Sequence, residues 1–356
     1  MSRARLRDLG IIIGTLPPGP CNAITDVLDV LVGHTTLIYD EPRVARTGVT
    51  VVVPRAGQIW KDNAFAAYHT FNGTGEMTGV HWLAESGLLC YPVAITNTGA
   101  VGTVHEAMVA YGREKALVFY AALPVVAETL DYWLNDMAGH HVKKEHLFQA
   151  LDRAKSGPVA EGNVGGGTGM ICYDFKGGIG TASRVVTTES GAFTVGALVQ
   201  ANHGDRADFR VDGVPVGREI GEEIVPFPWT QSRQAGSIII ILATDAPLIP
   251  VQCQRLAKRA TVGLARTGGM GYNASGDIFL AFATGNHFPG DAQQPYDLRM
   301  LPHHHLNSFF QGVAEAVEEA ILNALTAAEA MTGRDGHTAY ALPLDDLQQV
   351  MARYRG

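Results

Sequence analysis

Blocks of uniformly apolar positions run along the chain and predict buried strands. A strand buried on both faces is apolar at nearly every position, whereas a half-buried strand alternates. The strongest such block covers residues 238–243, where four consecutive isoleucines are followed by leucine and alanine, and it begins directly after Ser237. Further strands are expected at residues 49–53, 90–95, 179–186, 193–200 and 278–283.

Longer segments with apolar residues three and four positions apart predict helices. The clearest covers residues 308–331, in which Val313, Val317, Ile321 and Leu325 fall on one face, and Gly333 is expected near its C-terminal end. Other helices are expected at residues 104–116, 124–135 and 250–264. Strands mixed with helices, without a clear linker, predict sheets covered by helices in one unit that spans residues 1–356.

A glycine-rich cluster covers residues 162–169. It lacks the Gly-Lys-Ser/Thr ending of a phosphate-binding loop, and its spacing is not that of a dinucleotide-binding motif. We therefore expect tight turns and close backbone contacts in this segment and no nucleotide.

Composition narrows the class of protein. Hydrophobic residues make up 46% of the chain, enough for a large core, and a net charge of −8 without a Lys/Arg-rich stretch argues against nucleic-acid binding. No apolar run approaches the ~18 residues of a membrane span, and the run near the N-terminus is too short for a signal peptide. Four scattered cysteines predict free thiols in a reducing compartment, the cytoplasm. Neither a metal nor a cofactor is expected, because the three consecutive imidazoles of His303–His305 cannot all face one ion easily and no HExxH motif exists.

The candidate chemistry lies where the polar segment 212–236 meets the strongest strand. If the Gly236–Ser237 bond were cut, the Ser237 hydroxyl would be a nucleophile with its own α-amine as base, since such an amine titrates near ~7.7–8.0. Gly236 would tolerate an unusual backbone conformation that brings this hydroxyl onto its carbonyl. From this boundary alone, an ordinary loop-to-strand junction remains the alternative.

Several motifs in a fixed order resemble one known family over nearly the whole chain. They are Asn-Ala-Ile-Thr-Asp-Val at 22–27, Val-Gly-His at 32–34, Asn-Gly-Thr-Gly-Glu at 72–76, Leu-Pro-Val-Val-Ala-Glu-Thr at 123–129, Gly-Asn-Val-Gly-Gly-Gly-Thr-Gly-Met at 162–170, Val-Gln-Ala-Asn at 199–202, Gly-Ser-Ile-Ile at 236–239, Ala-Thr-Asp-Ala-Pro at 243–247 and Ser-Gly-Asp at 275–277. The chain thus resembles the L-aminopeptidase/D-amidase-esterase and β-peptidyl aminopeptidase family of self-processing N-terminal serine hydrolases.

The resemblance implies a fold and a maturation step. The fold is α+β, a four-layer αββα sandwich like that of N-terminal-nucleophile hydrolases but with the connectivity of the ornithine acetyltransferase superfamily. Autoproteolysis between Gly236 and Ser237 would give a large chain, 1–236, and a small chain, 237–356, in one folded unit. The family implies a homotetramer of such processed units.

The resemblance also implies catalytic roles at matching positions. Ser237 matches the nucleophile, and Ser275 and Asp277 match residues that support it, with Asp277 one methylene shorter than the glutamate of relatives. Asn202 matches the asparagine that stabilises the oxyanion. Asn202 as a strand cap and Ser275 as a turn former remain alternatives.

Two further positions would meet the substrate. Glu128 matches a carboxylate that binds the free amine of the substrate, although a solvated position on the expected helix 124–135 is the alternative. Trp133, in a Tyr-Trp pair where relatives often carry Gly-Tyr or Gly-Trp, is expected at the substrate site.

These roles predict an aminopeptidase that removes one N-terminal residue from short peptides, amides or esters of L-, D- or β-amino acids. The reaction would pass through an acyl-enzyme on Ser237. An acyltransferase of the ornithine acetyltransferase type is one alternative, although that group uses threonine as its nucleophile. A non-catalytic binding protein on the same fold is the other.

Overall fold

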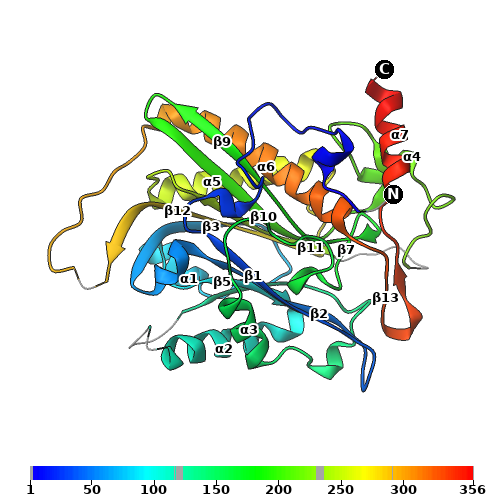
Figure 1. The fold of residues 1–356 in the computed structure, drawn as a ribbon, viewed down its shortest axis with the longest axis horizontal. Helices are drawn as coiled ribbons and strands as arrows, with labels where there is room; N and C mark the ends of the chain where they lie inside the picture. The colour runs from blue at the N-terminus through cyan, green and yellow to red at the C-terminus, as the bar shows by residue number, and fades with distance from the viewer. Residues whose placement is uncertain (1–2, 116, 118–122, 230–235, 291, 356) are drawn as a thin grey trace.

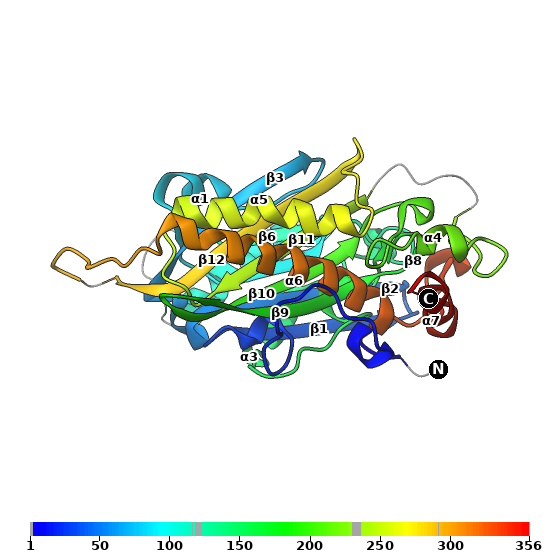
Figure 2. The same cartoon turned by 90° about the horizontal axis from the view of Figure 1, so that it is seen from above.

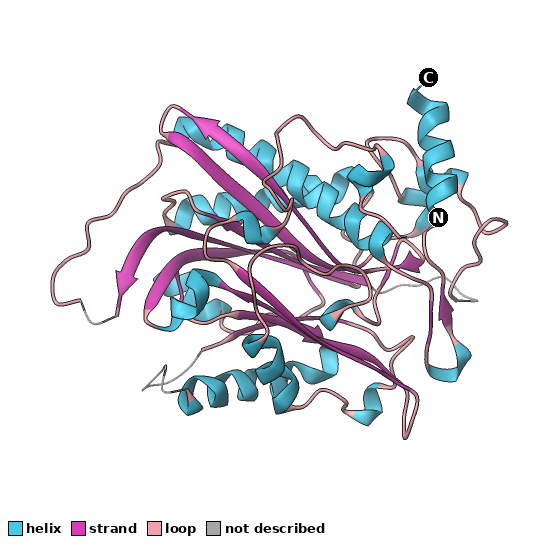
Figure 3. Cartoon of the chain, viewed as in Figure 1, coloured by secondary structure: helices cyan, strands magenta, loops and turns pink. Residues whose placement is uncertain are grey.

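Two β-sheets lie face to face, and helices cover both outer sides (Figures 1 and 3). The computed structural model describes residues 3–115, 117, 123–229, 236–290 and 292–355. These four layers confirm the α+β, αββα sandwich expected from the sequence.

The larger sheet has six strands in the order β4-β3-β12-β11-β10-β9. β11 and β12 are parallel, and the other neighbours are antiparallel. Helices α5 and α6 cover its outer face (Figure 2). The bounds are β3 Asp62–Gly73, β4 Leu88–Leu89, β9 Gly178–Thr188, β10 Gly191–Asn202, β11 Gly236–Thr244, β12 Ser275–Pro289, α5 Pro250–Arg266 and α6 Leu306–Ala327.

The smaller sheet has the order β1-β2-β5-β6, with β5 and β6 parallel, and is covered by α2 and α3. Its bounds are β1 Leu31–Tyr39, β2 Ala45–Val53, β5 Val93–Asn97, β6 Val125–Thr129, α2 Val101–Glu114 and α3 Lys144–Asp152. The remaining elements are α1 Val80–Ser86, β7 Ile171–Cys172, β8 Phe175–Lys176, α4 Val216–Glu219, β13 Met331–Thr332, β14 Thr338–Ala339 and α7 Leu344–Arg355. None of the described helices is long and apolar enough to cross a membrane.

β11 is apolar from Ile238 to Ala243 because its two faces enter two different cores. Ile238, Ile240 and Leu242 belong to the core under α5 and α6. Ile239 and Ile241 belong to the core between the two sheets. Because side chains alternate along a strand, the side chain of Ser237 lies on the side of Ile239, toward the smaller sheet.

The sequence-based elements are mostly confirmed, with two corrections. Residues 124–135 do not form the expected helix: Val125–Thr129 is strand β6, whose Val126 packs under α2 while Ala127 packs between the sheets. A segment buried on both faces loses the polar period that separates strand from helix. The last long helix ends at Ala327, so Gly333 is not near its end. Part of the expected polar loop, residues 230–235, lies outside the described residues.

Candidate active site

Ser237 stands at the head of a central strand with its hydroxyl on the bond that would be cut. Its Oγ donates a hydrogen bond to the carbonyl of Gly236 at 2.6 Å, and the Gly276 N–H donates to the same Oγ at 3.3 Å. The residue is 4% exposed. Position 236 favours glycine because the backbone of His203 lies close to it: an added Cβ would be 3.0 Å from Cα of His203. The backbone of Gly236 is not in the left-handed region.

Strand pairing brings the predicted catalytic residues together. Asn202 pairs directly with Ser237 across β10 and β11. On the other side, Ser275 pairs with Gly236 and Asp277 with Ile238 across the parallel strands β11 and β12. Strand β10 ends where the neighbouring strands β11 and β12 begin. Residues up to 75 positions apart in sequence are therefore neighbours in space.

Ser275 and Asp277 form a hydrogen-bonded pair beside the nucleophile. Ser275 Oγ donates to Oδ1 of Asp277 at 2.7 Å, and the N–H of Ile238 donates to the same oxygen at 3.2 Å. Burial raises the pKa of the Asp277 carboxyl, against the hydrogen bonds that lower it. Among the described residues no hydrogen bond joins this pair to Ser237 Oγ, and Asp277 contacts β11 through the backbone N–H of Ile238.

Asn202 is held by two backbone groups. Its Oδ1 accepts a hydrogen bond from the Ile171 N–H at 2.9 Å, and its Nδ2 donates to the Leu130 carbonyl at 3.0 Å. This pair of partners fixes which end of the amide is the donor. The orientation of the amide is thus set by strand β10, by the first residue of β7 and by the segment after β6.

Glu128 lies on the buried strand β6, so the alternative of a solvated helix face is wrong. Its Oε1 accepts a hydrogen bond from the Glu76 N–H at 3.0 Å, and its Oε2 accepts one from Thr98 Oγ1. Burial raises the pKa of the Glu128 carboxyl despite these donors. A Cβ on Gly75 would lie 3.2 Å from Oε1 and 3.0 Å from Cα of Gly276, so one glycine backbone lies between Glu128 and the strand that pairs with Ser237.

Trp133 belongs to an aromatic cluster three residues after Leu130. Its ring stacks on His337 with centroids 3.7 Å apart, and it meets Trp229 edge-on at 5.8 Å. Its buried indole Nε1 has no hydrogen-bond partner among the described residues. The structure thus places Trp133 three residues after the carbonyl that binds Asn202.

Thr98, Asn72 and the Gly276 N–H belong to the site but were not assigned from the sequence. Asn72 Oδ1 accepts a hydrogen bond from the Asp277 N–H at 2.8 Å. Thr98 follows β5, which is parallel to β6, and the carboxyl ends of parallel neighbours share an edge. A strand assignment for Val125–Thr129 would have pointed to Thr98.

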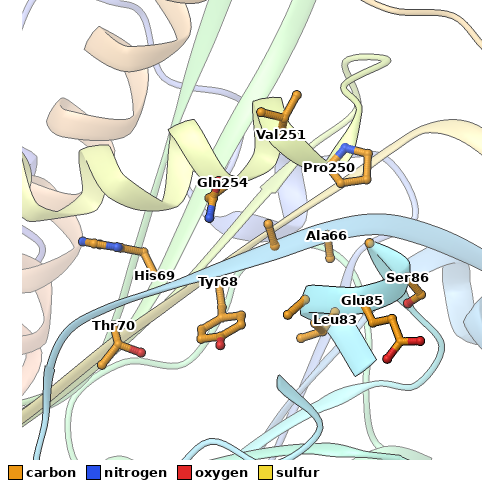
Figure 4. A pocket seen from close by; sticks show the side chains of 13 residues that line it. Ala66, Tyr68, His69, Thr70, Leu83, Glu85, Ser86, Pro250, Val251 and Gln254 are labelled. Atoms are coloured by element: carbon orange, nitrogen blue, oxygen red, sulfur yellow. The ribbon is translucent and has the colours of Figure 1, made fainter. Parts of the chain in front are cut away.

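A separate cleft of about 610 Å³ lies between β3, α1 and α5 (Figure 4). It is lined by Tyr68, His69, Leu83, Glu85 and Gln254 among others. None of the predicted site residues lines it. It therefore lies apart from the Ser237 site.

The fold and the site define a hydrolase of the N-terminal-nucleophile type, with a serine at the head of a central strand. The model of peptidase family S58 matches residues 22–339, so the chain belongs to this family. The β-peptidyl aminopeptidase of Sphingosinicella xenopeptidilytica is 46% identical over 98% of this chain and 90% of that protein.

Two solved structures are closely similar. A β-aminopeptidase from a Burkholderia species is 49% identical, with a TM-score of 0.92 over 98% of this chain and 99% of the other. The L-aminopeptidase D-Ala-esterase/amidase of Ochrobactrum anthropi, described as a variant of the N-terminal-nucleophile hydrolase fold, is 44% identical, with a TM-score of 0.93 over 99% of both chains. These relatives are aminopeptidases, which does not favour the acyltransferase alternative.

Proposed function

We propose that this protein is a self-processing serine aminopeptidase that removes one N-terminal residue from short peptides, amides or esters. Family membership and the named relatives establish the aminopeptidase class. The observation that carries the self-processing step is the Ser237 hydroxyl on the Gly236 carbonyl at the head of β11.

Self-processing would proceed as an acyl shift within one residue. Ser237 Oγ attacks the carbonyl carbon of Gly236, the hydroxyl proton passes to the peptide nitrogen, the C–N bond breaks, and an ester joins Gly236 to Ser237 Oγ. Water then hydrolyses this ester and leaves a carboxylate on Gly236 and a free α-amine on Ser237. The chain would become residues 1–236 and 237–356.

The free α-amine completes the site for substrate. It takes the proton of Ser237 Oγ as the hydroxyl attacks the scissile carbonyl and gives it to the leaving amine. Asn202 Nδ2 stabilises the negative charge on the tetrahedral intermediate. The acyl-enzyme on Ser237 is then hydrolysed by water, while Ser275 and Asp277 hold the strand that adjoins the nucleophile.

Substrate recognition would use Glu128 and Trp133. Glu128 is a buried carboxylate one glycine backbone away from the strand beside Ser237, which supports a contact with the substrate's ammonium group. Trp133 follows Leu130, whose carbonyl binds Asn202, and would meet the substrate together with the rings of Trp229 and His337.

Compartment and assembly are part of the same proposal. The four free cysteines, two of them buried, support a reducing compartment such as the cytoplasm. The homotetramer rests on the family resemblance, and light scattering on the purified protein measures it.

The mass of the denatured protein tests the function proposed here. Wild type should give two chains that begin at residues 1 and 237, whereas Ser237→Ala should stay whole. Ser86→Ala, at the half-buried last residue of α1 and outside the Ser237 site, is the matched control and should cut itself like wild type. An uncut and inactive wild-type chain would contradict the proposal.

A further inference from the structure

A fully buried lysine lies behind the candidate oxyanion asparagine. Lys176 on β8 is 0% exposed, and its Nζ donates to the carbonyls of Gly177 at 2.8 Å, Met170 at 2.9 Å and Gly167 at 3.4 Å. Three carbonyls match the three protons of an ammonium group. Within the part of the chain that the structure describes, no carboxylate forms an ion pair with it.

One of these carbonyls belongs to the peptide that binds Asn202. The Met170 carbonyl points to Lys176, and the N–H of the same peptide, on Ile171, donates to Oδ1 of Asn202 at 2.9 Å. Asn202 in turn pairs with Ser237 across β10 and β11. An unbroken series of hydrogen bonds therefore runs from a buried ammonium to the side-chain amide beside the nucleophile.

The direction of these hydrogen bonds matters for chemistry. A positive charge at a peptide carbonyl draws electron density toward the oxygen and makes the N–H of that peptide a stronger donor. The Ile171 N–H in turn draws electron density toward Oδ1 of the Asn202 amide, and the Nδ2 protons of that amide become more positive. Charge at Lys176 would thus strengthen the donor that meets the oxyanion, in a buried site where water screens little.

We propose that Lys176 is a positioning residue for the reaction at Ser237, which orients the Met170–Ile171 peptide and polarises the Asn202 amide. The proposal rests on the aminopeptidase function proposed above. Burial lowers the pKa of Lys176 to about 7, and the nearby Cys172 thiol opposes this. The three carbonyl acceptors around Nζ are the partners that an ammonium group requires.

A double-mutant cycle tests this role, because a residue that acts through Asn202 loses its effect once Asn202 is gone. The four proteins are wild type, Lys176→Met, Asn202→Ala and the double variant, assayed on a free-amine p-nitroanilide. We expect Lys176→Met to lower kcat about 10-fold with KM changed less than about two-fold, and Asn202→Ala to lower kcat about 100-fold or more. The double variant should match Asn202→Ala within about two-fold.

Controls separate this role from a general loss of structure. Leu264→Ala opens a cavity in the core under α5 and should lower Tm without the same non-additivity with Asn202→Ala. If any of the four proteins cuts itself only slowly, the rate at which the 237–356 chain appears replaces kcat throughout the cycle. If Lys176→Met does not fold, Lys176→Gln, which keeps two donors without charge, takes its place.

Three outcomes would overturn the proposal: full kcat in the lysine variant, losses that multiply in the double variant, or unfolding of both lysine variants. In each, Lys176 would be a residue of the fold alone. If wild type is active, these outcomes leave the aminopeptidase function standing. A wild-type chain that neither cuts itself nor turns over substrate would overturn both.

Discussion

At the scale of single residues, the carboxylate of Glu128 is buried and has no cationic partner among the described residues. Its two oxygens accept hydrogen bonds from Thr98 and from the Glu76 N–H, yet burial still raises the pKa of its carboxyl. A substrate ammonium group would supply the missing positive charge and bring this pKa back down. If Glu128 binds the substrate as proposed, the cost of burying its charge in the free enzyme would become selectivity for a free amine.

Glu128→Gln should therefore remove most of that selectivity. We expect kcat/KM for a free-amine p-nitroanilide to fall about 10- to 100-fold, the value of one charge-assisted hydrogen bond. The N-acetylated substrate should be a poor substrate of wild type. Glu76→Gln, which removes a neighbouring carboxylate with the same change, should keep kcat/KM within about three-fold. Equal turnover of acetylated and free-amine substrates by wild type would contradict a role for Glu128.

At the scale of elements, helix α6 carries polar residues on an otherwise apolar helix. Glu315 and Glu319, one turn apart, both meet Arg184 of β9, at 3.1 Å and 2.6 Å, and Arg7 also binds Glu319 at 2.8 Å. Burial alone would raise the pKa of Glu319, but Arg7 and Arg184 outweigh it and hold the pKa below its usual value. This ion cluster fastens α6 to the sheet and to the N-terminal segment.

Glu319→Gln should lower the free energy of unfolding by about 3 kcal/mol at pH 7, because it leaves buried arginine charge uncompensated. A carboxyl with a lowered pKa stabilises the fold above its unfolded pKa and loses that effect as the pH falls. The deficit should therefore stay constant down to about pH 4.5, the usual pKa of a glutamate, and shrink only below it. Urea unfolding in a Ser237→Ala background, which keeps the chain uncut, measures it.

Glu318→Gln is the matched control on the same helix. Burial raises the pKa of Glu318 to about 7, although Arg266 lies 3.4 Å away. A carboxyl with a raised pKa destabilises the fold as the pH rises through that value, so removing its charge should cost little at pH 7. Equal losses for Glu318→Gln and Glu319→Gln would contradict the assignment of the cluster.

Helices and strands whose packing produces a clear pattern of apolar positions could be predicted from the sequence. β11 is recognisable from its isoleucines, and α6 from its apolar spacing. β6 was mistaken for a helix because all five of its residues are buried, so no polar period remains. The place of Glu128 therefore needed the structure. The position of Lys176 could not be predicted from the sequence either, because its partners are backbone carbonyls, which every residue type carries.

At the scale of the whole molecule, the Gly236–Ser237 bond lies in the middle of a sheet rather than between domains. β11 and β12, which follow this bond, pair with β10 and β3, which precede it. Helices α5 and α6 also follow it and cover strands from both sides of it (Figure 2). The apolar core under these helices is therefore built from residues of both halves.

Cleavage should consequently leave one particle made of two chains. We expect residues 1–236 and 237–356 to co-elute from a native size-exclusion column at the volume of the uncut Ser237→Ala variant, and to separate only in denaturant. Refolding of the cut protein from urea should become slower at lower protein concentration, because two chains must meet before β11 can enter the sheet. Refolding of the uncut Ser237→Ala variant should depend less on concentration. A 237–356 chain recovered alone under native conditions would contradict this arrangement, since it would have left β3 and β10 without the strands that lie between them.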